Sequence, residues 1–460
     1  MSLLTQDAAG TASAAAILDR QSLRESSART YARWLQIVPV RASGMVIEGA
    51  DGRRYLDCLS GAGTLALGHN HPVVLEALQG VLDRRAPLHV LDIATPEKDD
   101  FVSALVEVLP AGLRERSRVH FCSPAGTDAV EAAIKLAHIA TGRRGLLAFT
   151  GAYHGMTLGA LAAGGATAPR ACVPGIAAEV TRLPFPYAYR CPFGIGGAAS
   201  GRLAVDFVER MLDDPCGGVL APAAMLVEAV QGEGGVIPAP DEWLRQMRRI
   251  TAERGIALIV DEVQTGVGRT GAMWAVEHSG VVPDVMVLSK AIGGSMPLSV
   301  LVYSERLDDW EPGAHTGTFR GTTLAMAAGA ATLRFVAAED LPSRAAQLGE
   351  RIAESLRELA RATDCVGDVR GRGLMLGLEL VEPGVEPDVA GARPAAPVLA
   401  QRVRAEALER GLIVELGGRH DAVVRLLPPL TMTDDEADAV VERLIGAVVA
   451  ARRSYVPGHA

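Results

Sequence analysis

The sequence predicts an α/β protein in which a mostly parallel sheet is flanked by helices on both faces. Two observations lead to this fold class. Short apolar runs rich in β-branched residues alternate with amphipathic stretches of helical period through the middle of the chain. Residues 118–140 show one such unit, in which the strand-like VHFC runs into the turn SPAGT and the helical DAVEAAIKLAHIA. Ligands in such folds bind at the carboxyl ends of strands, so functional residues are expected there.

The central elements follow from this alternation. Each strand is expected as a short apolar run that is buried on both faces of the sheet. The predicted strands are Val119–Cys122, Leu146–Phe149, Met225–Glu228, Ala257–Asp261, Val285–Leu288 and Val300–Tyr303.

The two ends of the chain differ from this centre. We expect a helical arm over Glu25–Ile37, followed by a hairpin over residues 45–61 with its turn at Asp51-Gly52. Near the C-terminus, helices and short strands alternate around an exposed Pro- and Ala-rich insertion at Val381–Pro397. The predicted helices are Ala337–Ala362, Val398–Arg410 and Asp434–Arg453, and the predicted strands are Leu374–Leu380, Leu412–Glu415 and Val423–Leu426.

These ends predict a smaller α+β domain that is built from both termini. The expected division is an N-terminal arm with part of the small domain (residues 1–70), a large ligand-binding domain (71–325) and a C-terminal small domain (326–460).

Composition narrows the class of protein. With 460 residues, 49% hydrophobic and 22% charged, the chain is expected to fold into a globular core, which excludes disordered and fibrous classes. A net charge of −9 argues against nucleic-acid binding. The six cysteines lack metal-ligand spacing, and we interpret His69 and His71 as loop residues, so no metal is predicted.

A cytoplasmic location is expected from the N-terminal composition. No basic residue precedes Arg20, and the apolar run near it is too short for a secretion signal. The uncharged stretch at residues 145–169 has the length of a membrane span, but its glycines favour an active-site loop.

Two polar residues stand at the ends of neighbouring predicted strands. The strand ALIVD ends in Asp261, and VMVL is followed by Ser289-Lys290 and a glycine-rich turn. Burial lowers the pKa of a lysine and makes its neutral amine nucleophilic, while a buried carboxylate can keep a ring nitrogen protonated. This pair is what pyridoxal 5′-phosphate (PLP) requires. A helix-capping aspartate and a surface lysine are the alternatives.

Two further motifs are candidates for ligand binding. The turn Ser123–Asp128 opens a helix whose free N–H groups and dipole favour an anion such as phosphate, although a helix cap by Thr127 or Asp128 explains the pattern equally. Tyr153-His154-Gly155 follows a strand, where an aromatic ring can stack on a planar cofactor or simply pack.

Seven motifs, in this order and spacing, resemble the class III aminotransferases of PLP fold type I over about residues 25–450. They are SPAGTDAVEAAIKLA, GAYHGMTLG, EAVQGEGGV, DEVQTGVGRTG, LSKAIGG, HTGTFRG and VRLLPPL. Within that class, SGAGTLALGHNHP, HVLDIATPEKDDF, YRCPFGIGG and HTGTFRG are most similar to diaminobutyrate–2-oxoglutarate aminotransferases. The resemblance implies PLP as the cofactor. It also implies a transaminase that moves the 4-amino group between L-2,4-diaminobutyrate or L-aspartate 4-semialdehyde and glutamate or 2-oxoglutarate.

The resemblance also implies roles for individual residues. Lys290 would bind the cofactor covalently and act in catalysis with Asp261, which pairs with the pyridine nitrogen. Gln264 would hydrogen-bond the phenolic oxygen, and Val263 would pack on the ring face opposite Tyr153. The remaining implied cofactor-binding residues are Gly126 and Thr127 at the phosphate, His154, Glu228, and Thr318, which would reach the phosphate of the other subunit of a homodimer with shared active sites.

A switch of ion pairs is implied for the substrates. Glu233 would pair with Arg425 while the diamine binds, and Arg425 would then swing out to bind the α-carboxylate of 2-oxoglutarate. A fixed charge of either sign would repel one of the two substrates, so a switch is needed. The alternative interpretation is that Glu233 and Arg425 form a purely structural ion pair. We hypothesise that Arg320 binds the distal carboxylate of 2-oxoglutarate.

Several other functions compete with this assignment. Ornithine and GABA aminotransferases carry an arginine where this chain has Met156, which counts against those substrates. Met156 and the diaminobutyrate-like segments argue against a transaminase for another ω-amine, such as ornithine, GABA or a polyamine. Thr322-Thr323 stands where diaminobutyrate enzymes usually have asparagine next to the glycine. A PLP aminomutase or decarboxylase would not need the Glu233–Arg425 pair, and a non-catalytic scaffold would not need Lys290 and Asp261. A PLP-sensing regulator would need an N-terminal DNA-binding domain with a basic recognition helix.

Overall fold

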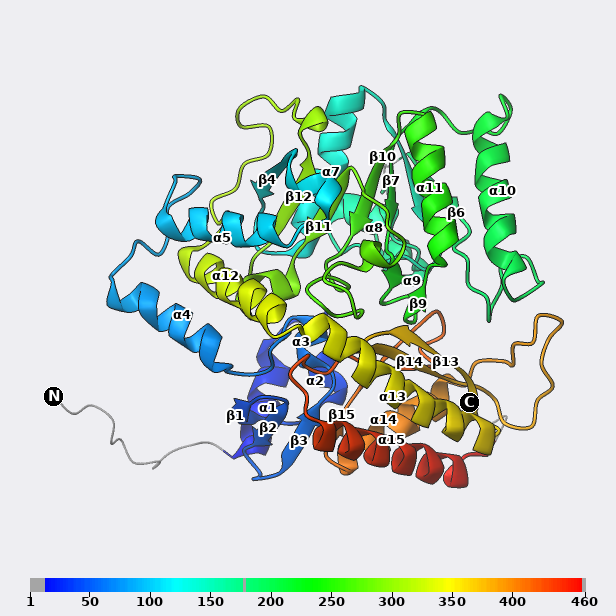
Figure 1. Ribbon diagram of the computed structural model, residues 1–460. Coiled ribbons are helices and arrows are strands. Elements are labelled where there is room, and N and C mark those ends of the chain that lie inside the picture. The colour runs from blue at the N-terminus through cyan, green and yellow to red at the C-terminus, as the bar shows by residue number, and fades with distance from the viewer. Residues whose placement is uncertain (1–12, 177–178, 457–460) are drawn as a thin grey trace.

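The computed structural model describes residues 13–176 and 179–456 and is built around a seven-stranded sheet (Figure 1). Its strand order is β4-β12-β11-β10-β7-β5-β6, and only β12 runs antiparallel to its neighbours. The bounds are β4 (Ser117–Phe121), β5 (Gly145–Phe149), β6 (Val180–Leu183), β7 (Pro222–Val227), β10 (Ala257–Asp261), β11 (Val285–Leu288) and β12 (Val300–Ser304). The predicted α/β class with a mostly parallel mixed sheet is therefore confirmed, as are its central strands.

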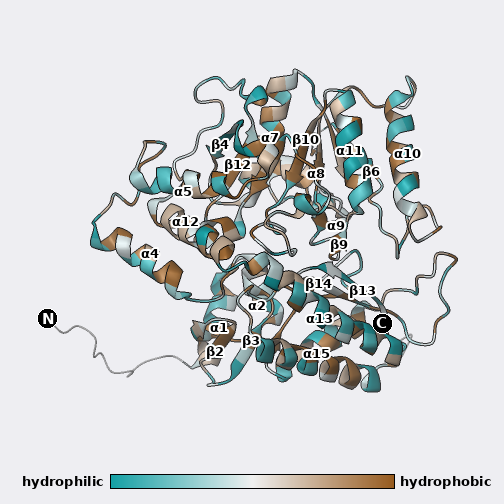
Figure 2. Ribbon diagram, in the orientation of Figure 1, coloured by the Kyte–Doolittle hydropathy of each residue, from teal (hydrophilic) through white to brown (hydrophobic). Residues whose placement is uncertain are grey.

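Both faces of this sheet are buried, which is why its strands read as continuous apolar runs. In β10, Ile259 packs into the cluster that contains α7 (Gly126–Thr141), whereas Leu258 and Val260 pack into the cluster that contains α11 (Asp241–Glu253). Successive side chains of a strand point to opposite faces, so a run of apolar residues serves both helix layers. Figure 2 shows the hydrophilic residues gathered on helices such as α10 (Ala199–Asp213), α11 and α15 (Asp434–Ser454).

Segments from the two ends of the chain share one of the smaller sheets. The antiparallel strands β1 (Pro39–Ser43), β2 (Val46–Gly49) and β3 (Arg54–Asp57) are joined by β15 (Leu412–Ile413), which runs parallel to β3. The two ends are therefore joined by strand pairing as well as by packing.

A second four-stranded sheet is formed by the C-terminal part alone. Its order is β13-β14-β17-β16, with bounds β13 (Val366–Arg372), β14 (Met375–Leu380), β16 (Glu415–Gly417) and β17 (Val423–Leu426). The helices α13 (Leu341–Ala362), α14 (Pro397–Glu409) and α15 lie beside it (Figure 1). The domain boundaries at residues 70 and 325 stay a prediction.

The remaining elements are short or connect these layers. They are α1 (Ala14–Arg24), α2 (Tyr31–Trp34), α3 (Ser60–Gly63), α4 (Pro72–Asp83), α5 (Pro96–Glu107), α6 (Ala111–Arg114), α8 (Leu158–Ala163), α9 (Thr167–Ala171), α12 (Thr323–Ala338), β8 (Val230–Gln231) and β9 (Ile237–Pro238), with 3-10 turns η1 (Ala275–His278), η2 (Lys290–Gly293) and η3 (Glu305–Leu307).

Some predicted boundaries are wrong, for local reasons. The arm Glu25–Ile37 is not one helix, since the Ser26 hydroxyl accepts a hydrogen bond from Ala28 N at 3.1 Å and favours a turn. The predicted helix Ala337–Ala362 is interrupted at Asp340, whose φ is +45°. The predicted strand Leu412–Glu415 is divided between two sheets.

The uncharged stretch at 145–169 forms β5, a loop and the short helices α8 and α9. Among the described residues, no helix has both the length and the apolar character of a membrane span. The expectation about a secretion signal concerns residues of which 1–12 lie outside the described part of the chain.

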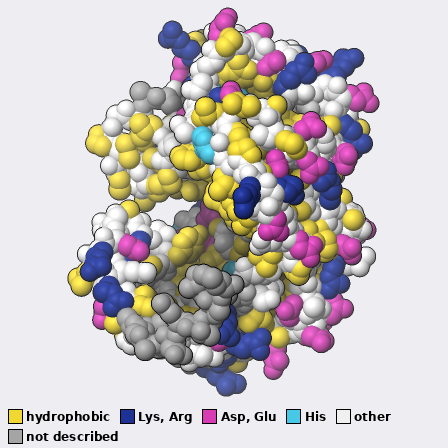
Figure 3. All heavy atoms as spheres, turned by 90° about the vertical axis from the view of Figure 1, so that its left-hand side faces the viewer, with side chains coloured by type: hydrophobic (Ala, Val, Ile, Leu, Met, Phe, Trp, Pro, Cys, Tyr) yellow, Lys and Arg dark blue, Asp and Glu magenta, His cyan; other side chains and the backbone are white. Residues whose placement is uncertain are grey.

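One face of the molecule carries many hydrophobic side chains around a central hollow (Figure 3). Helices α4 and α5 lie on this side in Figure 1. Exposed apolar residues of these helices and their connection are Leu75, Leu82, Leu88, Leu91 and Ile93. Such a concentration is typical of a surface that another protein covers.

Candidate active site

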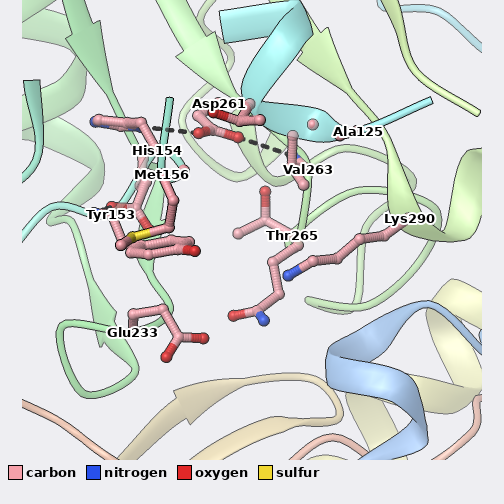
Figure 4. A pocket seen from close by; sticks show the side chains of 14 residues that line it. Ala125, Tyr153, His154, Met156, Glu233, Asp261, Val263, Thr265 and Lys290 are labelled. Carbon is pink, nitrogen blue, oxygen red and sulfur yellow. Dashed lines mark hydrogen bonds and ion pairs between the residues drawn. The ribbon is translucent and has the colours of Figure 1, made fainter. Parts of the chain in front are cut away.

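A pocket of about 290 Å³ lies where strands of the large sheet end (Figure 4). The segments that line it follow β4, β5, β7, β10 and β11 at their carboxyl ends, where an α/β sheet places its ligand. The structure brings together ten of the predicted site residues here: Gly126, Thr127, Tyr153, His154, Glu228, Glu233, Asp261, Val263, Gln264 and Lys290.

Lys290 presents its amine to this pocket (Figure 4). The residue starts η2, separated from the end of β11 by one residue, with φ +50°, a conformation that costs a non-glycine residue energy and is concentrated at functional sites. Burial lowers the pKa of its ammonium group. Among residues 13–176 and 179–456 its amine has no hydrogen-bond partner, so it is free to react with a ligand in the pocket.

Asp261 is fixed at the end of β10 by contacts to both carboxylate oxygens. Oδ1 accepts a hydrogen bond from Val263 N at 3.0 Å, and Oδ2 accepts one from His154 Nδ1 at 2.8 Å (Figure 4). Burial alone would lower the pKa of His154, but the hydrogen bond to Asp261 and the negative charges of Asp261 and Glu228 together raise it. The pair forms a rigid, buried acidic site that suits a protonated ring nitrogen.

The start of α7 supplies an anion site. Its cap residue Ala125 offers no side-chain hydrogen bond, and the N–H groups of Gly126 and Thr127 have no acceptor among the residues described. Asp128 instead accepts from Ser123 N at 2.8 Å, so neither it nor Thr127 caps the helix. The open N–H groups and the helix dipole therefore fit a phosphate group.

Gly155 lets the loop after β5 close over this helix start. A Cβ at this position would lie 2.3 Å from the Thr127 hydroxyl, and the backbone φ of +123° is one that other residues rarely adopt. Thr127 Oγ1 in turn lies 2.6 Å from Thr157 Oγ1 and accepts a hydrogen bond from Thr157 N at 3.1 Å. The YHG motif thus supplies two side chains to the pocket and, at Gly155, the only residue type whose size and backbone conformation fit there.

Glu228 joins the two loops that bear Tyr153 and Glu233. It is buried and accepts hydrogen bonds from Tyr153 N at 3.0 Å and Gly232 N at 2.9 Å. Burial raises the pKa of its carboxyl to about 7. The residue therefore holds the shape of the pocket.

The ring-facing residues lie as predicted around the cavity. Figure 4 shows Tyr153 and Val263 on opposite sides of it. Gln264 donates from Nε2 to Ala62 O at 3.0 Å, and its buried Oε1 has no partner among the described residues. One N–H of the amide is still available to an oxygen in the pocket.

Glu233 and Arg425 form the predicted ion pair, with 2.8 Å between Glu233 Oε1 and Arg425 Nη2. The same Nη2 also binds Glu415 Oε2, and Tyr31 donates its hydroxyl to Glu415 Oε1 at 2.8 Å. Sequence reasoning missed Glu415 and Tyr31. For Glu415 a signal existed, because a lone charge inside the apolar segment LIVEL is expected to have a buried partner.

Three predicted residues do not line this pocket within one chain. Arg425 is connected to it through Glu233, whereas Arg320 and Thr318 make their contacts elsewhere. Arg320 donates to His315 O at 3.0 Å and lines a separate pocket with Lys98 and His120. The carbonyl of Thr318 lies 2.7 Å from His89 Nε2. If Arg320 and Thr318 have their predicted roles, they act at a pocket other than the one that contains Lys290 of their own chain.

The histidines of GHNHP have separate contacts. His69 Nε2 lies 2.9 Å from Asp57 Oδ2, and the ring of His71 packs on Phe335 with 4.8 Å between ring centroids. Within the residues that the structure describes, no group of three or more metal-binding side chains converges.

Comparison with known proteins gives a consistent result. The family model "Aminotransferase class-III" matches residues 26–448. The chain is 54% identical to a diaminobutyrate–2-oxoglutarate aminotransferase of Rhizobium meliloti (strain 1021), over 96% of this chain and 94% of that protein. It is 44% identical to a protein of the same name from Haemophilus influenzae, over 98% of both chains. Among solved structures, a PLP-bound amine transaminase from an uncultivated Pseudomonas species has a TM-score of 0.82 and 32% identity, covering 93% of this chain and 98% of that one.

Proposed function

The chain belongs to the class III aminotransferases, which depend on PLP, and from this premise we propose that it transfers the 4-amino group of L-2,4-diaminobutyrate to 2-oxoglutarate. The observation that carries the proposal is the unpaired amine of Lys290 in a pocket that also holds Asp261 and the open start of α7. The products are L-aspartate 4-semialdehyde and glutamate. The direction of the reaction in the cell depends on which substrate pair is supplied.

The residues of the pocket fit the cofactor at three points. The start of α7 would bind the phosphate, Asp261 would keep the pyridine nitrogen protonated, and Lys290 would hold the cofactor covalently. When bound, PLP supplies a ring that accepts the electron pair of the C–H bond that is broken. Gln264 and Val263 complete the proposed ring contacts opposite Tyr153.

Lys290 then acts as the base. With donor and cofactor bound, Lys290 Nζ would remove the proton from C4 of the donor and would return it later in the same half-reaction. Burial lowers the pKa of Lys290, which increases the fraction of Nζ that is unprotonated and able to accept a proton.

The charges of the pocket select the two substrates. Glu233 places a carboxylate in it, which favours a cationic diamine. When 2-oxoglutarate binds, Glu233 and Arg425 separate so that the guanidinium receives the α-carboxylate. Met156 lines the pocket without a charge, so the distal carboxylate needs another cation, for which we retain Arg320.

We further propose a homodimer with shared active sites. Thr318 and Arg320 lie outside the pocket of their own chain, as expected if they serve the partner's site. The exposed apolar residues around α4 and α5 provide a surface for the second subunit (Figure 3). A cytoplasmic location accords with six free cysteines.

Product analysis tests the proposed reaction. Purified holoenzyme is incubated with L-2,4-diaminobutyrate and 2-oxoglutarate, and glutamate and aspartate 4-semialdehyde are quantified by mass spectrometry. We expect equal amounts of both, a loss of at least about a thousand-fold in Lys290→Ala, and full activity in the control Lys135→Ala, which is remote from the pocket. Glutamate formation from ornithine or 4-aminobutyrate but not from diaminobutyrate would refute the substrate assignment.

A further inference from the structure

A chain of four polar side chains extends from the surface into the active site. Tyr31, which is partly exposed, donates its hydroxyl to Glu415 Oε1 at 2.8 Å. Glu415 Oε2 binds Arg425 Nη2, and the same nitrogen lies 2.8 Å from Glu233 Oε1. Only Glu233 of these four lines the pocket that holds Lys290.

Glu415 and Arg425 are fixed to each other by the sheet. They are direct partners in the antiparallel pairing of β16 with β17, and both are buried. Glu233, by contrast, lies in the glycine-rich turn between β8 and β9, and its side chain is about one third exposed. When the Glu233–Arg425 pair opens for the keto acid, the sheet therefore keeps the backbone of Glu415 beside that of Arg425.

The cluster has unequal charges and incomplete hydrogen bonding. Two carboxylates share one guanidinium, so the cluster has one carboxylate more than it has cations, and Glu415 is the more deeply buried of the two. On Arg425 itself, Nε and Nη1 are buried and have no partner among the described residues. Buried charge and unpaired donors are both costly, and a ligand that satisfies them is bound for that reason.

This combination matches the zwitterionic end of an α-amino acid. An ammonium group would balance the second carboxylate, and a carboxylate would accept from the free donors of Arg425. We propose that Glu415 is a specificity-determining residue that recognises the α-ammonium group of the amino donor, with Tyr31 as the residue that positions it. The inference rests on the proposed function, because it concerns the donor of that reaction.

Two donors that differ by one group provide the test. L-2,4-Diaminobutyrate and 4-aminobutyrate have the same carbon chain, carboxylate and reacting amine, and differ only in the ammonium group at C2. The ratio of their kcat/KM values, measured with holoenzyme and 2-oxoglutarate, therefore reports recognition of that group. Glu415→Gln removes the charge of the residue and retains one of the two oxygens that accept from Tyr31 and Arg425.

We expect the diaminobutyrate to 4-aminobutyrate ratio to fall at least about ten-fold in Glu415→Gln, which is the effect of losing a charge-assisted contact. Tyr31→Phe should lower the ratio by a smaller factor, and it carries the test if Glu415→Gln does not fold. Glu382→Gln is the matched control, because Tyr455 donates to Glu382 at 2.7 Å outside the pocket and the ratio should not change.

An equal loss of activity toward both donors in Glu415→Gln and Tyr31→Phe would show a merely structural role and overturn the inference. An unchanged ratio would overturn it as well. Both results leave the proposed function intact as long as the wild-type enzyme uses diaminobutyrate, whereas a wild-type enzyme inactive on diaminobutyrate would refute the proposed function itself.

Discussion

Glu262, the neighbour of Asp261, is buried, so its carboxyl group loses contact with water when the protein folds. Val276 N donates to Oε1 at 2.9 Å and the Thr265 hydroxyl donates to Oε2, so the side chain ties the end of β10 to η1. Burial nevertheless raises the pKa of Glu262 to about 7, well above that of an exposed glutamate. Between about pH 4.5 and about pH 7, the folded state therefore keeps a proton on Glu262 that the unfolded state releases.

This shift predicts a pH-dependent effect of Glu262→Gln. A raised pKa stabilises the fold below the unfolded pKa, and that contribution is lost as pH rises from about 4.5 through about 7. The neutral amide avoids this loss, so the variant should gain up to about 3 kcal/mol in unfolding free energy at pH 8 relative to its effect at pH 4.5. Urea unfolding at both pH values measures it. The same change in stability at both pH values would contradict the assigned protonation.

At the scale of elements, the site depends on where helix α7 starts and on the loop that covers it. The helix begins without a side-chain cap, and the loop after β5 approaches it at Gly155. The free N–H groups of α7 and the close approach of the loop backbone serve the same end. A capping side chain, or a larger residue in the loop, would occupy the position proposed for the phosphate.

We predict that Gly155→Ala destabilises the protein by about 3 kcal/mol and weakens PLP binding, through both the strained φ and the contact with Thr127. The control is Gly142→Ala at the other end of α7, where φ is also positive and no atom lies within 4 Å of the added Cβ, so that only about 1 kcal/mol is lost. Urea unfolding and PLP titration measure both effects. Equal losses in the two variants would show that crowding against Thr127 is unimportant.

The elements also show what could be predicted from the sequence. The central strands could be predicted from the sequence, and so could the positions of Asp261 and Lys290. An apolar run that ends in a charged residue indicates both a buried strand and its functional end. Tyr31 was not, because its contact to Glu415 spans 384 positions and its own segment was expected to be an uninterrupted helix. The division of Leu412–Glu415 between two sheets likewise depends on tertiary pairing.

At the scale of the whole molecule, the site is held by both ends of the chain. Cys58 N donates to Ile413 O at 3.0 Å, and Leu427 N donates to Cys58 O at 2.8 Å, which fixes the segment before α3 against the strand that bears Arg425. The pocket of one chain still lacks Thr318 and Arg320. These residues connect the site to the proposed dimer.

A mixing experiment tests shared sites. Lys290→Ala inactivates the site of its own chain, and Thr318→Asp places a negative charge beside the phosphate of the partner's site if Thr318 acts there. Co-expression of the two inactive variants should then restore about a quarter of wild-type activity, because half of the dimers contain one intact site. No recovery in dimers confirmed by mass, with 48.1 kDa per chain, would show that Thr318 does not serve the partner's site.

The most direct test of the central claim is the absorbance of the purified holoenzyme between about 300 and 500 nm during two successive additions. We predict that L-2,4-diaminobutyrate without keto acid removes the long-wavelength band of the lysine-bound cofactor, and that 2-oxoglutarate then restores it. A band that persists with diaminobutyrate, or that is lost and not restored by 2-oxoglutarate, would contradict the account.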